Sequence, residues 1–420
     1  MFGSIFSTTT FKQSQITIVG TLINGALGAL FYIVLARFLG PADFGLLTIS
    51  LTTLVLVADI ADIGTNTGLI RFVSSHISKD REKAYRFLKL SLEIKLVAWV
   101  AAFLTVYLLA PFLAVQVFQK ESLLLPLRLV SFGIGGALLF TFATSALQAF
   151  QKYFLWSLIN IFTNALRLVV ILILGYLSSL NIESSLLTYI ALPFFGFFVA
   201  LLLIPTRQFM QTKGEFSLSK SLFKYNISVA IFTMIAAFSA RLDTYLNAAL
   251  LSSREVGIYG AANQLVQIMP QLVSALGLVS SPKFASFTNN NQMLAFFKKF
   301  QILVLGLCVL GILTIPASVF LLPVLLGSVY SEAVNPFIFL FLANLIFLFS
   351  IPVHHSIIFY FGRPDVFIWV SVGHLLIIGT FGYLLILSFG ITGAALAVLA
   401  GTVFNFLYPL GWLILKLKRK

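Results

Sequence analysis

Long apolar segments separated by short polar breaks run through the whole chain. A helix needs roughly 20 mostly apolar residues to cross a bilayer, and twelve segments reach that length. The pattern therefore predicts an all-α polytopic membrane protein with twelve transmembrane helices. The segments cover approximately residues 14–38, 44–74, 88–110, 124–149, 154–177, 185–206, 225–251, 257–282, 299–326, 334–361, 365–388 and 391–415.

An internal repeat relates the first six segments to the last six. A shift of 212 residues superposes the first two apolar segments on the seventh and eighth. We therefore predict two six-helix halves, 1–212 and 213–420, related by a pseudo-two-fold axis along the membrane normal. Two facing halves of this kind can enclose a central cavity and permit alternating access. The shift pairs Lys12 with Lys224, Asp43 with Glu255, Gly45 with Gly257 and Arg71 with Lys283.

Composition and charge agree with a membrane protein. Apolar residues make up 60% of the chain, charged residues 10%, and the net charge is +14. A basic balance can indicate a nucleic-acid partner, but here the positive-inside rule explains it better, and we expect no nucleic acid. Most Lys and Arg gather in one set of alternate breaks, which predicts a protein of the cytoplasmic membrane with both termini in the cytoplasm. The other set holds Arg37, Lys120, Arg128 and Arg254.

Ionisable side chains lie near the middle of several apolar segments. Charge at that depth is costly and usually faces a cavity or an opposite charge. Because four segments supply such groups at one depth, the sequence predicts a single wet site near the midplane. The residues are Asp59 and Asp62 in the second segment, Arg167 in the fifth, Arg241 and Asp243 in the seventh, and His374 in the eleventh.

Two further polar stripes follow helical spacing. Residues three, four or seven apart share one face of a helix, so each stripe is expected to line the central cavity and bind substrate. One stripe is Asn160, Asn164 and Arg167 in the fifth segment, and the other is Gln264, Gln267 and Gln271 in the eighth.

The charges have a structural interpretation as well as a functional one. Arg241 and Asp243 are two residues apart and point about 200° from each other on an ideal helix, so each needs a partner elsewhere. Asp59 or Asp62 can neutralise Arg167 or Arg241 as an interhelical ion pair. Such a pair does not exclude a functional role, because a ligand, a proton or a sodium ion can replace one partner.

The sequence contains no pattern typical of an enzyme or a nucleotide-driven pump. It has no metal-ligand cluster, no phosphate-binding glycine loop with Lys, and no Ser/His/Asp arrangement that its spacing supports. We therefore expect no catalytic activity, no bound metal and no cofactor. A proton or sodium gradient, the membrane potential or consumption of the product would have to supply the energy.

The second segment and the turn before it carry a family resemblance. Residues 36–45, ARFLGPADFG, are followed by a long apolar segment and then by Arg71 and Phe72. This pattern resembles the N-terminal signature of Wzx-type polysaccharide biosynthesis flippases, which belong to the multidrug/oligosaccharidyl-lipid/polysaccharide exporter superfamily. The resemblance implies a V-shaped helical transporter, similar to the multidrug and toxin extrusion (MATE) transporters.

The resemblance also implies a substrate and partners. Such flippases move polyprenyl-diphosphate-linked oligosaccharides, the repeat units of O-antigen, capsule or exopolysaccharide, from the cytoplasmic to the outer leaflet. Their central cavity is commonly cationic, and Arg167 and Arg241 would suit a diphosphate. Expected partners are this lipid-linked glycan, membrane lipid, and the polymerase and glycosyltransferases of the same pathway.

Two other functions stay open at this point. Asp59, Asp62, Asp243 and His374 could couple an ion gradient to the export of drugs or other small molecules, as in the multidrug antiporters of the same superfamily. A membrane glycosyltransferase or glycan ligase is a third possibility. The short outer loops argue against it, because such enzymes generally need a sizeable catalytic loop or domain.

Overall fold

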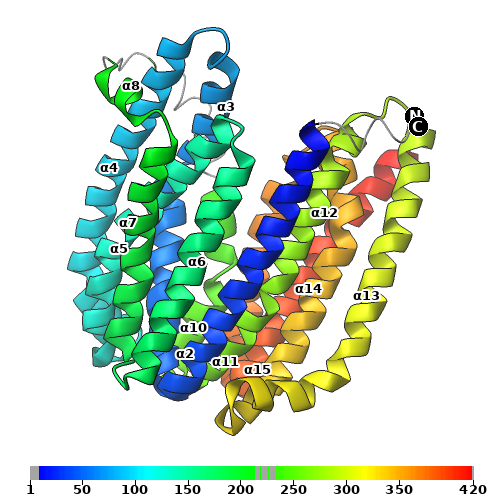
Figure 1. The fold of residues 1–420 in the computed structure, drawn as a ribbon. Helices are drawn as coiled ribbons and strands as arrows, with labels where there is room; N and C mark the ends of the chain where they lie inside the picture. Colours follow the sequence, from blue (N-terminus) through cyan, green and yellow to red (C-terminus); the bar gives the residue numbers. More distant parts are fainter. Residues whose placement is uncertain (1–8, 213–217, 219–225, 227–229, 231–232, 419–420) are drawn as a thin grey trace. The chain divides into compact units, whose positions relative to one another are not determined.

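The computed structural model describes residues 9–418, apart from 213–217, 219–225, 227–229 and 231–232. Helices dominate these residues, and no strand occurs among them (Figure 1). The α-helices are α2 (Thr9–Asp62), α3 (Thr65–His76), α4 (Arg81–Phe112), α5 (Leu124–Ala149), α6 (Tyr153–Tyr176), α7 (Ile182–Leu203), α8 (Thr206–Gln211), α10 (Leu242–Leu250), α11 (Ser253–Val266), α12 (Ile268–Ala285), α13 (Asn290–Leu326), α14 (Val334–His355) and α15 (Val366–Lys418). Short π or 3-10 turns cover Leu113–Val117, Glu121–Leu123, Ser328–Ala333 and Ser356–Tyr360.

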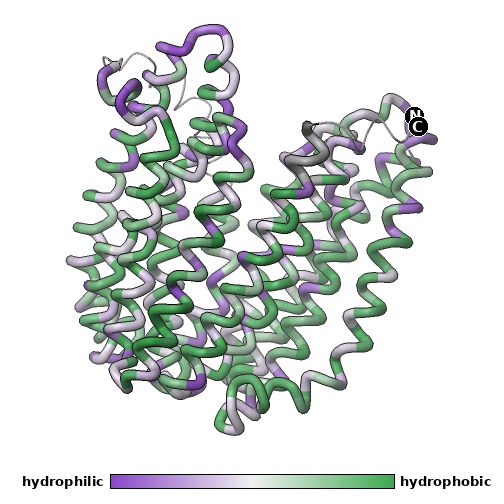
Figure 2. The backbone as a smooth tube through the Cα atoms, viewed as in Figure 1, coloured by the Kyte–Doolittle hydropathy of each residue, from purple (hydrophilic) through white to green (hydrophobic). Residues whose placement is uncertain are grey.

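The helices agree with the predicted membrane architecture. Within the described residues, nine helical stretches are long and apolar enough to cross a membrane, and hydrophobic residues dominate them (Figure 2). Two of the nine, α2 and α15, each contain two helices that meet at a glycine with non-helical backbone, Gly40 (φ 72°) and Gly390 (φ 57°). Divided at these glycines, the nine become eleven. The remaining predicted segment, 225–251, includes residues outside the described set and ends with α10.

The chain forms two compact units. Unit 1 is Met1–Phe31 with Leu46–Ala237, and unit 2 is Tyr32–Gly45 with Phe238–Lys420. The second unit therefore takes a short segment from within α2. The division into halves at residue 212 stays a prediction of the repeat.

Each unit is built around one central helix. In unit 1, α5 packs against α3, α4, α6 and α7, and in unit 2, α14 packs against α11, α12, α13 and α15. Small residues on α5 let its neighbours approach closely. A Cβ on Gly133 would lie 2.6 Å from the Ile190 side chain, and one on Gly135 would overlap Trp99. The two central helices are the fourth of each predicted set of six, as the repeat requires.

Two glycines of unit 2 allow reciprocal close approaches between two turns. A Cβ on Gly45 would overlap the carbonyl oxygen of Ser253, and a Cβ on Gly257 would overlap that of Pro41. The 212-residue shift places Pro41 on Ser253 and Gly45 on Gly257, so the two close approaches are the same contact taken in both directions. A two-fold relation between the two turns produces this reciprocity.

The early segment of unit 2 is fixed by a buried tyrosine. The Tyr330 hydroxyl donates a hydrogen bond of 2.9 Å to the Ala36 carbonyl oxygen, and both residues are fully buried. The ring of Phe44 lies edge-on to that of Tyr330, with 6.4 Å between centroids. Residues 32–45 are thus an integral part of unit 2.

Candidate functional site

The second apolar segment is broken in the middle, where the sequence predicted one continuous stretch over 44–74. The helix stops at Asp62, and the backbone turns through Ile63 (φ 49°) and Gly64 (φ 69°) before α3 begins. A positive φ is unfavourable for a β-branched residue, so nearby interactions must hold the break. Asp62 Oδ1 accepts a hydrogen bond of 2.9 Å from Thr65 Oγ1 and so fixes the start of α3.

A buried lysine pairs with the carboxylate at this break. Lys95 Nζ on α4 lies 2.5 Å from Asp62 Oδ1, and the Lys95 side chain is 0% exposed, against 17% for Asp62. The ammonium also lies 3.4 Å from Thr141 Oγ1 on α5. Lys95 thus neutralises Asp62 and joins three helices of unit 1.

The sequence did not predict this partner of Asp62. Its structural alternative paired Asp59 or Asp62 with Arg167 or Arg241, and it overlooked Lys95, although this lysine stands inside the apolar segment 88–110. A basic residue flanked by Ile94 and Leu96 in such a segment was the available signal. Helical periodicity assigns residues to faces of their own helix but does not show which neighbouring helix packs there.

A cavity of about 220 Å³ lies beside this ion pair in unit 1. Its wall brings together three of the predicted site residues, Asp59, Asp62 and Arg167, from α2 and α6. Asn66 of α3, Thr141 of α5 and Tyr189 of α7 are the other polar residues of the wall. The wall of this cavity in unit 1 carries charges of both signs, whereas Arg241, Asp243 and His374 are not among its residues.

Aromatic rings hold the arginine of the cavity. The Arg167 guanidinium carbon lies 4.1 Å from the ring centroid of Tyr189 and 5.6 Å from that of Phe31. Among the described residues, Arg167 forms no ion pair, and its buried Nε has no hydrogen-bond partner. Stacking on a ring face leaves the planar edge of the guanidinium able to bind an oxyanion with two parallel hydrogen bonds.

The two asparagines of the same stripe make other contacts. Asn164 Nδ2 donates to Asn24 Oδ1 on α2 at 2.5 Å, and Asn160 Nδ2 donates to the Trp156 carbonyl oxygen at 2.8 Å. Neither belongs to the wall of the cavity. Of this stripe, the structure brings Arg167 alone to the cavity, while Asn164 joins α6 to α2.

The carboxylate of unit 2 has a different environment. Asp243 on α10 is 5% exposed and accepts a hydrogen bond from the Tyr259 hydroxyl of α11. One turn later, Asn247 is 0% exposed, and within the described residues neither of its side-chain polar atoms has a hydrogen-bond partner. Asp243 thus finds its partner on another helix, as its spacing from Arg241 predicted. Arg241 itself is the N-cap residue of α10.

The remaining predicted residues also lie in unit 2. His374 Nδ1 on α15 is 2.7 Å from Ser239 Oγ, just before α10. Gln264 lies on α11 and Gln271 on α12, and the helix is interrupted between them at Gln267. The predicted glutamine stripe therefore crosses a helix break.

Comparison with known proteins assigns the family. The family model described as "Polysaccharide biosynthesis protein" matches residues 11–288. The chain belongs to this family. No curated protein matches the sequence.

Solved structures show the same fold for this polysaccharide biosynthesis protein. One match is described as "Lipid II flippase MurJ, inward closed conformation", with 15% identity, coverage of 94% of this chain and 87% of that chain, and a TM-score of 0.77. Another is an inward-facing MATE family multidrug resistance transporter, with 14% identity, coverage of 98% and 99%, and a TM-score of 0.75. A third is the MATE multidrug transporter DinF-BH, at 15% identity, coverage of 96% and 94%, and a TM-score of 0.70.

Proposed function

We propose that this polysaccharide biosynthesis protein is a flippase for polyprenyl-diphosphate-linked oligosaccharides, which it moves from the cytoplasmic to the outer leaflet by alternating access. The observation that carries the proposal is Arg167. Its guanidinium lies on a cavity wall, stacked on Tyr189 and without an ion-pair partner among the described residues. A diphosphate offers the oxygen geometry that a guanidinium edge binds best.

The balance of charge around the cavity suggests how transport is coupled. Lys95 already pairs with Asp62, so Asp59 is the second carboxylate on the wall that carries Arg167. If Asp59 takes up a proton or a sodium ion, the wall loses one negative charge and binds the headgroup more strongly. Loss of that ion on the other side of the membrane then favours release. Asp243 and His374 are proposed as further coupling groups.

The rest of the substrate would contact other parts of the molecule. The amide side chains of Asn160, Asn164 and the glutamines, together with the Arg241 guanidinium, are proposed contacts of the sugars and the headgroup, and the polyprenyl tail would stay in lipid. A cytoplasmic-membrane location with both termini inside, and a polymerase and glycosyltransferases as partners, belong to the same proposal.

The test compares two stacked arginines of unit 1. Arg128 lies 5.0 Å from the Tyr107 ring centroid and is absent from the cavity wall, so Arg128→Ala is a matched control for Arg167→Ala. We expect Arg167→Ala to lower lipid-linked precursor translocation in cells at least about tenfold, the loss of one charge-assisted contact, at normal protein abundance. Arg128→Ala should leave it unchanged. Normal surface glycan in the Arg167→Ala strain, or in a strain that lacks the gene, would contradict the proposal.

One observation favours a second function, the ion-coupled export of small molecules. The cavity carries two carboxylates, Asp59 and Asp62, which could attract organic cations, and MATE multidrug transporters share the fold. This function predicts gradient-driven dye efflux from proteoliposomes that Asp59→Asn abolishes. Asp365→Asn is a suitable control, because Asp365 is exposed and outside the cavity. Absence of dye efflux from the wild-type protein would exclude this alternative.

A further inference from the structure

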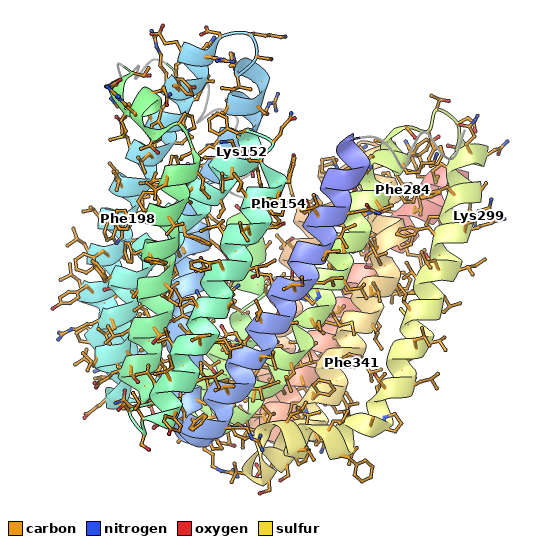
Figure 3. All side chains as sticks on the ribbon, in the orientation of Figure 1. Lys152, Phe154, Phe198, Phe284, Lys299 and Phe341 are labelled. Atoms are coloured by element: carbon orange, nitrogen blue, oxygen red, sulfur yellow. The ribbon has the colours of Figure 1, made fainter. Side chains whose placement is uncertain are left out.

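Unit 1 contains a second cavity, which has no role in the transport proposed for the first one. It has a volume of about 440 Å³ and lies where the turn between α3 and α4 meets the start of α6 and the end of α7. Its polar wall includes Arg81, Tyr85 and Lys152, and its apolar wall includes Ile77 and Leu202. Lys152 is at this end of unit 1 (Figure 3). The segments that line the cavity join the predicted cytoplasmic ends of the helices.

The two basic groups of this cavity are available to an anion. Arg81 has no ion-pair partner among the described residues, because its acidic neighbours are engaged elsewhere. Asp80 caps α4 by accepting the Lys83 backbone N–H at 3.0 Å, and Glu82 pairs with Arg86 at 2.5 Å. The two carboxylates make the electrostatic potential near Arg81 less positive, but neither forms an ion pair with Arg81.

The second basic group stands at a junction of two helix ends. Lys152 Nζ donates a hydrogen bond of 2.8 Å to the Leu203 carbonyl oxygen, the last residue of α7. Lys152 is also the N-cap residue of α6, and no side chain caps that end. The first backbone N–H groups of a helix lack intrahelical partners and carry partial positive charge. The partial positive charge at the start of α6 lies next to Lys152, although the residues that follow Lys152 in α6 are not part of the cavity wall.

The apolar wall continues onto the outer surface of α7. Leu202 is 84% exposed and Phe198, one turn earlier on α7, is 62% exposed. Side chains of this kind on a membrane-spanning helix face lipid. The cavity thus combines two exposed basic side chains, Arg81 and Lys152, with an apolar edge at the end of a transmembrane helix. Phospholipid headgroups meet the acyl chains at such a level.

We propose that this cavity binds the phosphate of an anionic phospholipid at the predicted cytoplasmic interface. Arg81 and Lys152 contact the phosphate oxygens, Tyr85 supplies a hydroxyl donor, and an acyl chain lies along Leu202. The inference goes beyond flippase activity, since it assigns a separate site for a lipid of the surrounding membrane. The diphosphate of the proposed substrate offers the same chemistry and is the competing source of phosphate.

Native mass spectrometry of the purified, detergent-solubilised protein can test this site. Phosphatidylglycerol should bind more tightly than phosphatidylcholine. Each of Arg81→Gln and Lys152→Gln should weaken phosphatidylglycerol binding about fivefold, as expected for one basic residue at a membrane surface. Lys79→Gln removes a neighbouring charge that is not part of the cavity wall and should leave binding unchanged. Because Lys152→Gln also removes the bond to Leu203, Arg81→Gln with an unchanged melting temperature is the decisive variant.

Two results would overturn the proposal. One is equal phosphatidylglycerol binding by Arg81→Gln and wild type, and the other is equal binding of phosphatidylcholine and phosphatidylglycerol. A second titration with undecaprenyl diphosphate distinguishes the source of the phosphate. If Arg81→Gln weakens only this ligand, the cavity receives the substrate and the phospholipid assignment is wrong. Weakened phosphatidylglycerol binding supports the proposal whether or not the protein flips lipid-linked glycans, because the assay measures no transport.

Discussion

The carboxylates at membrane depth in the two units have opposite surroundings. In unit 1, Asp62 pairs with the Lys95 ammonium and lies on the wall of a cavity. In unit 2, Asp243 is 5% exposed and accepts a hydrogen bond from the neutral phenol of Tyr259. An acidic residue in an apolar segment therefore does not define a role by itself. Two properties decide whether such a residue can bind substrate, couple transport to an ion, or only stabilise the fold. They are the charge of its partner and its access to a ligand.

The largest effect is expected when the charged partner in unit 1 is removed. Lys95→Met leaves Asp62 without its cation, and loss of one partner of a buried ion pair typically costs about 3–5 kcal/mol. We expect a strong loss of thermal stability in detergent. The double variant Lys95→Met/Asp62→Asn removes both charges and keeps an acceptor for Thr65, so it should recover most of the loss. Equal stability of the single and double variants would show that the unpaired charge of Asp62 does not cause the loss.

A smaller effect is expected when the neutral partner in unit 2 is removed. Tyr259→Phe deletes one hydrogen bond to the buried Asp243 carboxyl and should cost about 2 kcal/mol, typical of a buried acceptor left without its donor. The change in the free energy of unfolding should stay below that of Lys95→Met in the same assay. Asp243→Asn in the Tyr259→Phe background is the control, because it replaces the carboxyl with an amide. A larger effect of Tyr259→Phe than of Lys95→Met would reverse the comparison.

The smallest effect is expected at an exposed ion pair. Arg363 Nη2 lies 2.8 Å from Asp365 Oδ2, with both side chains at least half exposed, and the hydrogen bond from Arg363 lowers the pKa of Asp365. A lowered carboxyl pKa stabilises the folded state at neutral pH, and this contribution disappears as the pH falls through that pKa. Solvent screens such pairs, so Arg363→Gln should leave the melting temperature at pH 7 unchanged. A clear decrease would mean that exposure is a poor guide to the strength of ion pairs here.

The sequence predicted the helices better than the partners of their polar residues. Segment length and hydropathy are properties of one helix, which is why the apolar stretches were found. The pairing of Asp62 with Lys95 depends on how separate helices pack, and helical periodicity does not contain that information. Asn164 shows the same limit. Its spacing predicted a place on the cavity wall, but its side chain instead donates a hydrogen bond to Asn24 on α2.

The break at Ile63 and Gly64 escaped prediction for a different reason. The apolar pattern continues across these residues, and a single glycine in such a segment is a weak signal. Asp59 and Arg167 both line the cavity, and the sequence placed each near the middle of its apolar segment. The sequence therefore indicated two of the residues that line this cavity, whereas it did not indicate the backbone break beside them.

The segment 32–45 also sets an order of events during synthesis. Ala36 accepts its hydrogen bond from Tyr330, 294 residues later in the chain. At 5–20 residues per second, the ribosome needs roughly 15–60 s to cover that interval. The early part of α2 must therefore wait in the membrane for a partner that has not been made, and unit 2 cannot complete its packing until most of the protein has been translated.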